Sequence, residues 1–298
     1  CGREAARQGS RGMGPFSSTR PNPGKYEELK SDAQRILGVD AFEGAKFDFH
    51  KMLNQKLHVL HNIWLGGQQG VPPYIFGANF VDEERMTLTS HIDMGGRLTG
   101  RAIAQLTDSL NVKLQATAGP DSNSFKADGE YKGSSNYLHA YVQPMGGQNV
   151  AVGADFMQSL TENLAVGCEG VFARGAFFGG GAGARLSWGG KGENVATAKV
   201  GNLGASSVEL AYSRKVSPKV GLATELAYYH GQNCTFGLGY EFALQRATFK
   251  GLIQSDTTCT AALEERISPG VSLLLTGMLN HKKKDYKFGV GIVIQNQL

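Results

Sequence analysis

The sequence has few cysteines and no closely spaced pair of them. Its 298 residues include four cysteines, Cys1, Cys168, Cys234 and Cys259, and none belongs to a CxxC pair. We therefore expect neither a disulfide framework nor a structural zinc site. Charge is also scarce, since 19% of the residues are charged and the net charge is +4. A charge this small and dispersed argues against nucleic acid as a partner.

Long apolar runs are missing as well. No stretch of about 18 consecutive apolar residues occurs, which excludes a transmembrane helix. A second way of crossing a bilayer stays open, because a spanning strand needs only about 9–11 tilted residues with every second one apolar. Such strands leave no long apolar run in the sequence.

Residues arranged for catalysis are the third absence. His58 and His61 would lie on opposite faces of a strand, so we expect no metal site between them. The glycine run 179–183 lacks a following phosphate-binding helix and is interpreted as a bend in a wall. Nothing in the sequence aligns a nucleophile with a base. We expect no enzyme and no cofactor.

The N-terminal region is unlike the rest of the chain. Residues 1–24 are rich in Gly, Ser, Pro and Arg, which is typical of a flexible basic arm. Residues 25–38 predict one helix, with an apolar stripe from Tyr26 to Leu37 and Gly38 as its stop. A helix this short needs other parts of the chain for its stability.

From residue 43 to residue 298 the apolar pattern has a period of two. Turn signals such as Gly95-Gly96 and Ser217-Pro218 recur throughout, and they separate roughly nineteen strands of about ten residues. In the last strand, Phe288, Val290 and Ile292 share an apolar face. Strands of this length joined by short turns favour a transmembrane β-barrel over stacked soluble sheets. A barrel with this many strands encloses a pore.

Five short stretches carry a resemblance to a known family. They are Pro23–Glu28, Phe42–Lys46, Asp128–Gly133, Phe249–Gly251 and Leu279–Lys284. With them the chain resembles the mitochondrial porin superfamily, and within it the channel-forming subunits of the translocase of the outer mitochondrial membrane, the TOM complex. The resemblance implies a nineteen-stranded barrel, antiparallel except for a parallel pair of the first strand with the last, and a helix inside the pore.

The resemblance also implies an insertion signal in the final strand. The family's signal is a polar residue, a glycine two positions later and two alternate hydrophobic residues. Lys287, Gly289, Ile292 and Ile294 occupy these positions.

The alternation assigns many charged side chains to the lumen. We expect acidic patches there to attract basic presequences, as carboxylate rings attract cations in selective pores. The residues proposed for these patches are Asp128, Glu130, Glu209, Glu225 and Glu264. The other interpretation is that they are simply solvated residues of a pore wall. Aromatic residues near strand ends would suit the two membrane interfaces, and the alternative for some of them is to line the pore: Trp64, Tyr74, Tyr137, Tyr228, Tyr229 and Tyr286.

The resemblance implies a protein-conducting channel of the mitochondrial outer membrane that imports unfolded precursors. Its implied partners are presequences, small single-span subunits, a receptor subunit, lipid and a second copy of the barrel. A voltage-dependent anion or metabolite channel of the same superfamily is the alternative, and a lumen dominated by Lys and Arg would favour it. A soluble all-β binding protein is the third candidate.

Overall fold

The computed structural model describes residues 21–66, 71–82, 85–120, 123–145, 149–190, 193–202, 206–231 and 234–296. Much of the arm predicted for residues 1–24 lies outside these ranges. Across the described residues the chain forms one helix followed by nineteen strands. None of the helical residues that the structure describes forms a helix long and apolar enough to cross a membrane.

The helix precedes all the strands in the sequence. The helix is α1 (Ser31–Leu37). The strands are β1 (Gly44–Met52), β2 (Leu57–Leu65), β3 (Tyr74–Asp82), β4 (Met86–Asp93), β5 (Leu98–Thr107), β6 (Leu110–Ala118), β7 (Asn123–Lys132), β8 (Asn136–Pro144), β9 (Val150–Ser159), β10 (Leu164–Ala173), β11 (Ala176–Trp188), β12 (Asn194–Gly201), β13 (Ser207–Ser217), β14 (Val220–Tyr229), β15 (Thr235–Ala243), β16 (Ala247–Gln254), β17 (Thr258–Ser268), β18 (Val271–Asn280) and β19 (Asp285–Asn296).

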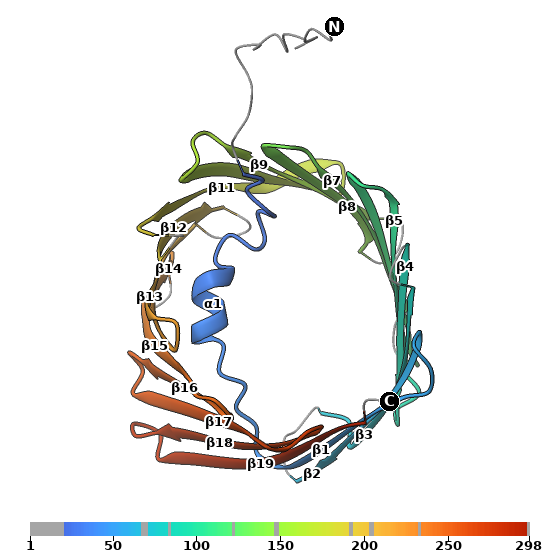
Figure 1. Ribbon diagram of the computed structural model, residues 1–298. Coiled ribbons are helices and arrows are strands. Elements are labelled where there is room, and N and C mark those ends of the chain that lie inside the picture. Colours follow the sequence, from blue (N-terminus) through green and yellow to red (C-terminus); the bar gives the residue numbers. More distant parts are fainter. Residues whose placement is uncertain are drawn as a thin grey trace, which may run out of the picture.

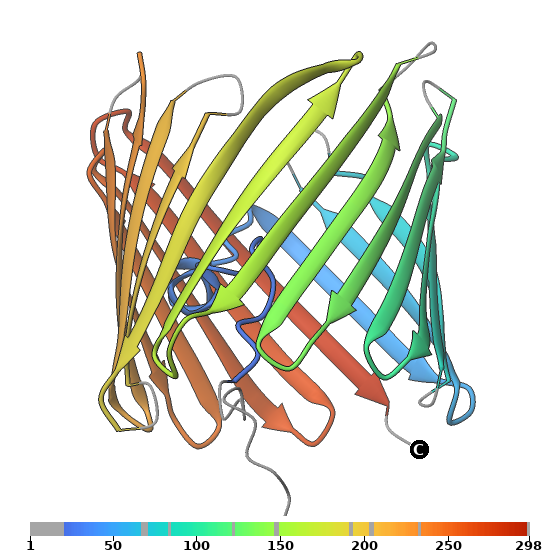
Figure 2. The same ribbon diagram turned by 90° about the horizontal axis from the view of Figure 1, so that it is seen from above.

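The strands close into a barrel. Each strand pairs antiparallel with the next, and β1 pairs in parallel with β19, with Gly44 opposite Gly289. An odd number of up-and-down strands requires this, because the first and last strands then run in the same direction. Figure 1 shows the closed ring along its axis, and Figure 2 shows the tilt of the strands. The predicted barrel and its parallel closure are confirmed.

The two faces of each strand differ as the alternation predicts. On β14, Leu222, Leu226 and Tyr228 point outward and are 40%, 36% and 43% exposed, while Ala223 and Ala227 are buried on the lumen side. A soluble core would place the large side chains inside. Apolar side chains outside and small or polar ones inside are the arrangement of a barrel that lies in lipid.

The aromatic residues divide between the two faces. Tyr74, Tyr228 and Tyr286 lie on the outer face, where they suit a membrane interface. Trp64, Tyr137 and Tyr229 face the lumen. The interface prediction is therefore wrong for these three, because strand parity, and not nearness to a strand end, decides which face a side chain occupies.

The helix is shorter than the apolar stripe indicates. It begins at Ser31, and the preceding residues form tight turns in which the Leu29 amide donates to the Tyr26 carbonyl at 3.1 Å and the Ser31 amide to the Glu28 carbonyl at 2.9 Å. These bonds span three residues, as in a 3₁₀ turn. Tyr26 and Leu29 are both fully buried, so the tight turns serve the packing of these side chains.

The glycine run 179–183 is not a bend. These residues form the middle of β11 and pair in register with β10 and β12. The chain reverses earlier, at Arg174 and Gly175, whose φ angles of 54° and 75° match a two-residue hairpin turn. Residues without a side chain are needed at Gly181 and Gly183, because the side chain of Tyr26 lies over them.

Candidate functional site: the lumen and the segment that crosses it

Residues 21–43, called the lumenal segment below, run inside the barrel before β1 begins. Figure 1 shows α1 within the ring, against the wall formed by β13 to β16, and these strands contact it. Its first end is held by Asn22, whose side-chain amide donates to the Gly133 carbonyl at 2.6 Å. The Ser159 hydroxyl donates to the Pro21 carbonyl at 2.8 Å. The segment is thus anchored on the β7–β9 side of the barrel.

Lys25 makes the first ionic contact with the wall. Its ammonium lies 3.1 Å from the Glu130 carboxylate, which also pairs with Lys113 on β6. Burial acts to lower the pKa of Lys25, but the hydrogen bonds and the negative charge of Glu130 outweigh it, and the pKa is raised. Glu130 therefore joins the lumenal segment to two neighbouring strands.

Tyr26 is one of the fully buried side chains of the segment. It is 1% exposed, and a Cβ atom added to Gly181 or Gly183 would lie 3.1 or 3.2 Å from its ring or hydroxyl. The ammonium of Lys199 lies 4.6 Å from the centre of its ring. Burial, together with the nearby Glu169 carboxylate, raises the pKa of the Tyr26 hydroxyl. The glycines of β10 and β11 leave the space that the side chain of Tyr26 occupies.

Lys30 lies between two carboxylates. Its ammonium is 2.7 Å from Glu209 on β13 and 2.6 Å from Glu225 on β14, and all three side chains are mostly buried. Burial acts to lower the pKa of Lys30, and the hydrogen bonds from its ammonium to Glu209 and Glu225 more than compensate, so the pKa is raised. Two strands thus hold one cation.

Two further ion pairs hold α1. Arg185 donates to Asp32 at 2.5 Å, and the Arg35 guanidinium lies 3.5 Å from Glu241. Lys250 donates to the Arg35 carbonyl at 2.9 Å, which satisfies a carbonyl near the end of the helix.

The apolar side of α1 fits onto small residues of the wall. Ile36 and Leu37 are buried, and a Cβ atom added to Gly221 or Gly239 would lie 2.9 or 2.8 Å from them. Ala211 and Ala223 complete this cluster. Alternate small residues on β14 and β15 therefore form a hollow in which the helix lies.

The segment leaves the lumen at the closure of the barrel. The Thr276 hydroxyl donates to the Phe42 carbonyl at 3.1 Å, and the Phe42 ring meets Trp64 edge to face at 5.5 Å. A side chain at Gly289 would collide with the Phe42 carbonyl and ring. The glycine of the proposed insertion signal thus also has a packing role.

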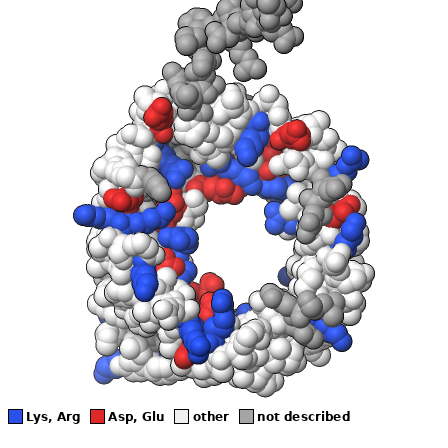
Figure 3. Space-filling view, viewed as in Figure 1, with Lys and Arg blue, Asp and Glu red and all other residues white. Residues whose placement is uncertain are grey.

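The predicted acidic residues all lie on the lumen face, and the structure brings four of them into ion pairs. Glu130, Glu209 and Glu225 bind lysines of the lumenal segment. Asp128 pairs with Lys126 at 2.9 Å, on the wall itself. Glu264 lies opposite Thr248 in the β16–β17 register, on the lumen face but apart from the segment. Figure 3 shows acidic and basic side chains beside one another around the opening.

Several contact residues were missed from the sequence. Glu241, Arg185 and Lys199 all face the lumen and contact the lumenal segment. Strand parity could have found Glu241, which shares the small-residue face of its strand with Gly237 and Gly239. The lysines of the segment gave no sequence signal, because the carboxylates that bind them lie far away in the chain.

One group of described side chains has the composition of a cation site. Glu27, His139 and Asp155 bring one possible ligand atom each to within 4.8 Å of one another. His139 already hydrogen-bonds to Asp155 at 2.6 Å and lies 3.3 Å from Asp128. These contacts account for both ring nitrogens of the histidine.

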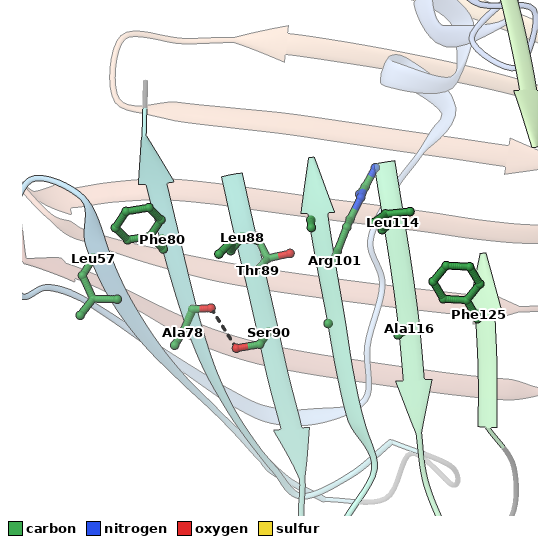
Figure 4. A pocket seen from close by; sticks show the side chains of 12 residues that line it. Leu57, Ala78, Phe80, Leu88, Thr89, Ser90, Arg101, Leu114, Ala116 and Phe125 are labelled. Atoms are coloured by element: carbon green, nitrogen blue, oxygen red, sulfur yellow. Dashed lines mark hydrogen bonds between the residues drawn. The ribbon is translucent and has the colours of Figure 1, made fainter. Parts of the chain in front are cut away.

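The outer wall carries an apolar groove of about 590 Å³ across β2 to β7. Figure 4 shows large side chains around small ones there, with Ser90 donating to the Ala78 carbonyl. Outward-facing residues that line it are Leu57, Phe80, Leu88, Leu114 and Phe125. Such a surface suits lipid chains or an apolar helix.

Comparison with known proteins agrees with this geometry. The family model described as "Eukaryotic porin" matches residues 22–289. The chain is 31% identical over 294 residues to the "Probable mitochondrial import receptor subunit TOM40-2" of Arabidopsis thaliana, covering 92% of this chain and 91% of that protein. It is 28% identical over 288 residues to the "Mitochondrial import receptor subunit TOM40B" of Bos taurus, covering 92% of each.

A third relative is the "Mitochondrial import receptor subunit TOM40 homolog" of Xenopus laevis, 29% identical over 297 residues, with 94% of this chain and 86% of that protein covered. Among solved structures, a mutant of Rh. blastica porin is similar with a TM-score of 0.47 and 8% identity, covering 76% of this chain and 92% of that chain. By the family match and these relatives, the chain belongs to the eukaryotic porin family, among the mitochondrial import receptor subunits of the TOM40 type.

Proposed function

We propose that this chain is the protein-conducting channel of the mitochondrial outer membrane, through which unfolded precursors with basic presequences are imported. The chain matches its relatives over nearly their whole length, and those relatives are named mitochondrial import receptor subunits. The observation that carries the proposal is the closed barrel whose lumen wall binds a lysine of the lumenal segment through two carboxylates. Such a wall offers a moving cationic chain successive weak contacts and needs no chemistry of its own.

The acidic patches of the lumen are the proposed contact sites for presequences. Glu209, Glu225 and Glu264 lie on one side of the barrel, between β13 and β17. Asp128 and Glu130 form a second patch on β7. Two patches separated along the wall would let a presequence exchange one set of contacts for another while it moves.

The partners follow from the import complex to which such a subunit belongs. We propose that small single-span subunits and a receptor subunit bind the apolar outer wall, with lipid covering the remainder, and that a second barrel is present in the assembly. The groove across β2 to β7 has the apolar surface that a membrane-spanning helix needs.

Lys287, Gly289, Ile292 and Ile294 are the proposed insertion signal. The proposed division of the chain is an arm to residue 24, a lumenal stretch over 25–38 that contains α1, and the barrel from residue 43.

The test is single-channel conductance of the purified chain in a planar bilayer, with a synthetic presequence peptide and a charge-neutral scrambled control. We expect brief, voltage-dependent blockades by the presequence and none by the control. A large, anion-selective channel indifferent to both peptides would instead assign the chain to metabolite transport. A chain that forms no channel would contradict both functions.

A further inference from the structure

The lumenal segment shares two features with the ligand proposed for the pore, its regularly placed cations and its apolar stripe. Lys25, Lys30 and Arg35 recur every five residues, and each forms an ion pair with a carboxylate of the wall. Next to two of these cations in the sequence, Leu29 and Ile36 are buried against the wall. Cations placed beside an apolar stripe are also a feature of a mitochondrial presequence, although the whole segment, unlike a presequence, carries more acidic than basic residues.

The wall is shaped for a helix of this kind. Glu209 and Glu225 meet the cation, and Gly221 and Gly239 leave room for the apolar residues about two turns later. These four residues are called the α1 seat below. Among the residues that the structure describes, Lys30 is the only cation within ion-pair distance of either glutamate of the seat. If α1 leaves, two neighbouring carboxylates of the lumen face lose their counterion, and a cation of an incoming chain can take its place.

The helix itself is poorly stabilised apart from the wall. It has seven residues, and Lys30 at its N-cap position makes no side-chain cap hydrogen bond. Isolated helices of this length are not stable in water. The contacts with the seat therefore decide whether α1 is formed, so a ligand that takes the seat would also unfold α1.

One contact of α1 has no counterpart in a presequence. Asp32 accepts a hydrogen bond from Arg185 at 2.5 Å, outside the α1 seat. Presequences are poor in acidic residues. A presequence could reproduce the Lys30 and apolar contacts, but not this one. Asp32 thus offers a way to weaken α1 without altering the seat.

We propose that the α1 seat is a binding site for basic amphipathic helices, and that α1 occupies it as an internal competitor that an incoming presequence displaces. The site takes a lysine between Glu209 and Glu225, with apolar residues at three, six and seven positions after it, as Ala33, Ile36 and Leu37 stand after Lys30. This inference rests on the proposed function and adds which part of the wall binds and what occupies it at rest.

The first readout is hydrogen–deuterium exchange of the full chain in detergent micelles, with and without a presequence peptide. Displacement predicts faster exchange of the amides of residues 31–38, because the bonds such as Gly38 to the Gln34 carbonyl are lost. A peptide that binds and leaves exchange over 31–38 unchanged, or slows it, overturns the competition.

The second readout is the concentration of peptide that gives half-maximal blockade in Asp32→Asn. Weakening α1 raises the fraction of empty seats, so we expect this concentration to fall roughly fivefold. Asp82→Asn is the matched control, since Asp82 loses only an exposed pair with Lys56 at the rim. An equal value in wild type, Asp32→Asn and the control overturns the competition.

The two proposals fail in different ways. If peptides block all these channels equally and the hydrogen–deuterium exchange of α1 does not change, the proposed import function is retained. The proposal that α1 and presequences compete for the α1 seat is then rejected. If the peptide blocks none of the channels, wild type included, the proposed function itself fails.

Discussion

Lys30 and Glu225 are 195 residues apart in the chain, and the lysine ammonium lies 2.6 Å from the carboxylate. The pair joins the lumenal segment to β14, and Glu209 on β13 completes it at 2.7 Å. Because one cation serves two carboxylates, its removal leaves two unpaired charges on the pore wall. The consequences are both structural and electrical.

Lys30→Met keeps the apolar stem and removes the charge. We expect docking of α1 to weaken by about 1–3 kcal/mol, since buried charged groups lose their partner. We also expect the pore to become more cation-selective, because the lumen gains net negative charge. The reversal potential in a salt gradient measures the second effect, and Lys56→Met at the exposed rim is the control for loss of a lysine. Equal reversal potentials in both variants would show that Lys30 does not control the pore field.

The raised pKa of Lys30 predicts how docking depends on pH. The pKa of Lys30 is higher when α1 is docked than its ordinary value of 10.5. Protonation of Lys30 therefore stabilises the docked state fully at pH values below 10.5, and this stabilisation is lost as the pH rises through the raised pKa. We therefore expect no lysine-linked release of α1 between about pH 6 and pH 9, and release at higher pH. Single-channel conductance as a function of pH measures it. Lys30→Met should lack the alkaline step, and a step that persists in this variant must come from other groups.

The glycine hollow of the wall makes a separate prediction. A Cβ atom at Gly239 would lie 2.8 Å from Leu37, so Gly239→Ala should loosen the end of α1 and leave the barrel closed. Gly129→Ala on β7 is the control, because nothing lies within 4 Å of the added atom. Cleavage by trypsin at Arg35 measures the loosening, and we expect it to accelerate only in Gly239→Ala. Equal cleavage of the two variants would mean that α1 does not depend on this hollow.

The insertion signal is best tested at its polar position. Lys287 makes only exposed, long ion pairs, at 3.8 Å to Glu43 and 4.0 Å to Asp285. Such pairs contribute little stability, so Lys287→Gln should leave the thermal stability of the refolded barrel unchanged. If the residue belongs to an insertion signal, assembly into isolated mitochondria should nevertheless slow. Normal assembly would remove Lys287 from the signal. Gly289 is less suitable, because any side chain there also displaces Phe42.

The sequence predicts the barrel well because its information is local. Alternation along a single strand, as in Leu222 and Leu226 against Ala223, identifies the outer and lumen faces without knowledge of the neighbours. The closure of β1 on β19 is different. The turn signals give only roughly nineteen strands, whereas a parallel closure requires the count to be odd, and the family resemblance supplied that exact count.

The contents of the lumen could not be predicted in the same way. Lys30 meets Glu225, and Tyr26 meets Gly181, only after the strands are in register around the ring. The beginning of α1 was misplaced for the same reason, since Tyr26 and Leu29 follow the spacing of a helix but are held in tight turns by their packing. Four of the five predicted carboxylates form ion pairs. Asp128 pairs with Lys126 two residues away, but nothing in the local sequence identifies the Lys25 and Lys30 partners of the other three.

The most direct test of the import channel compares two adjacent alanines of β17. Ala262 faces the lumen opposite Lys250, and Ala261 faces outward opposite Gly251. A photo-crosslinking residue is placed at each position, and a precursor fused to a ligand-stabilised folded domain is arrested during import into isolated mitochondria. The account predicts crosslinks to the arrested precursor from position 262 and none from position 261. Crosslinks from 261 alone, or from neither position while the arrested precursor still blocks import, would contradict passage through this lumen.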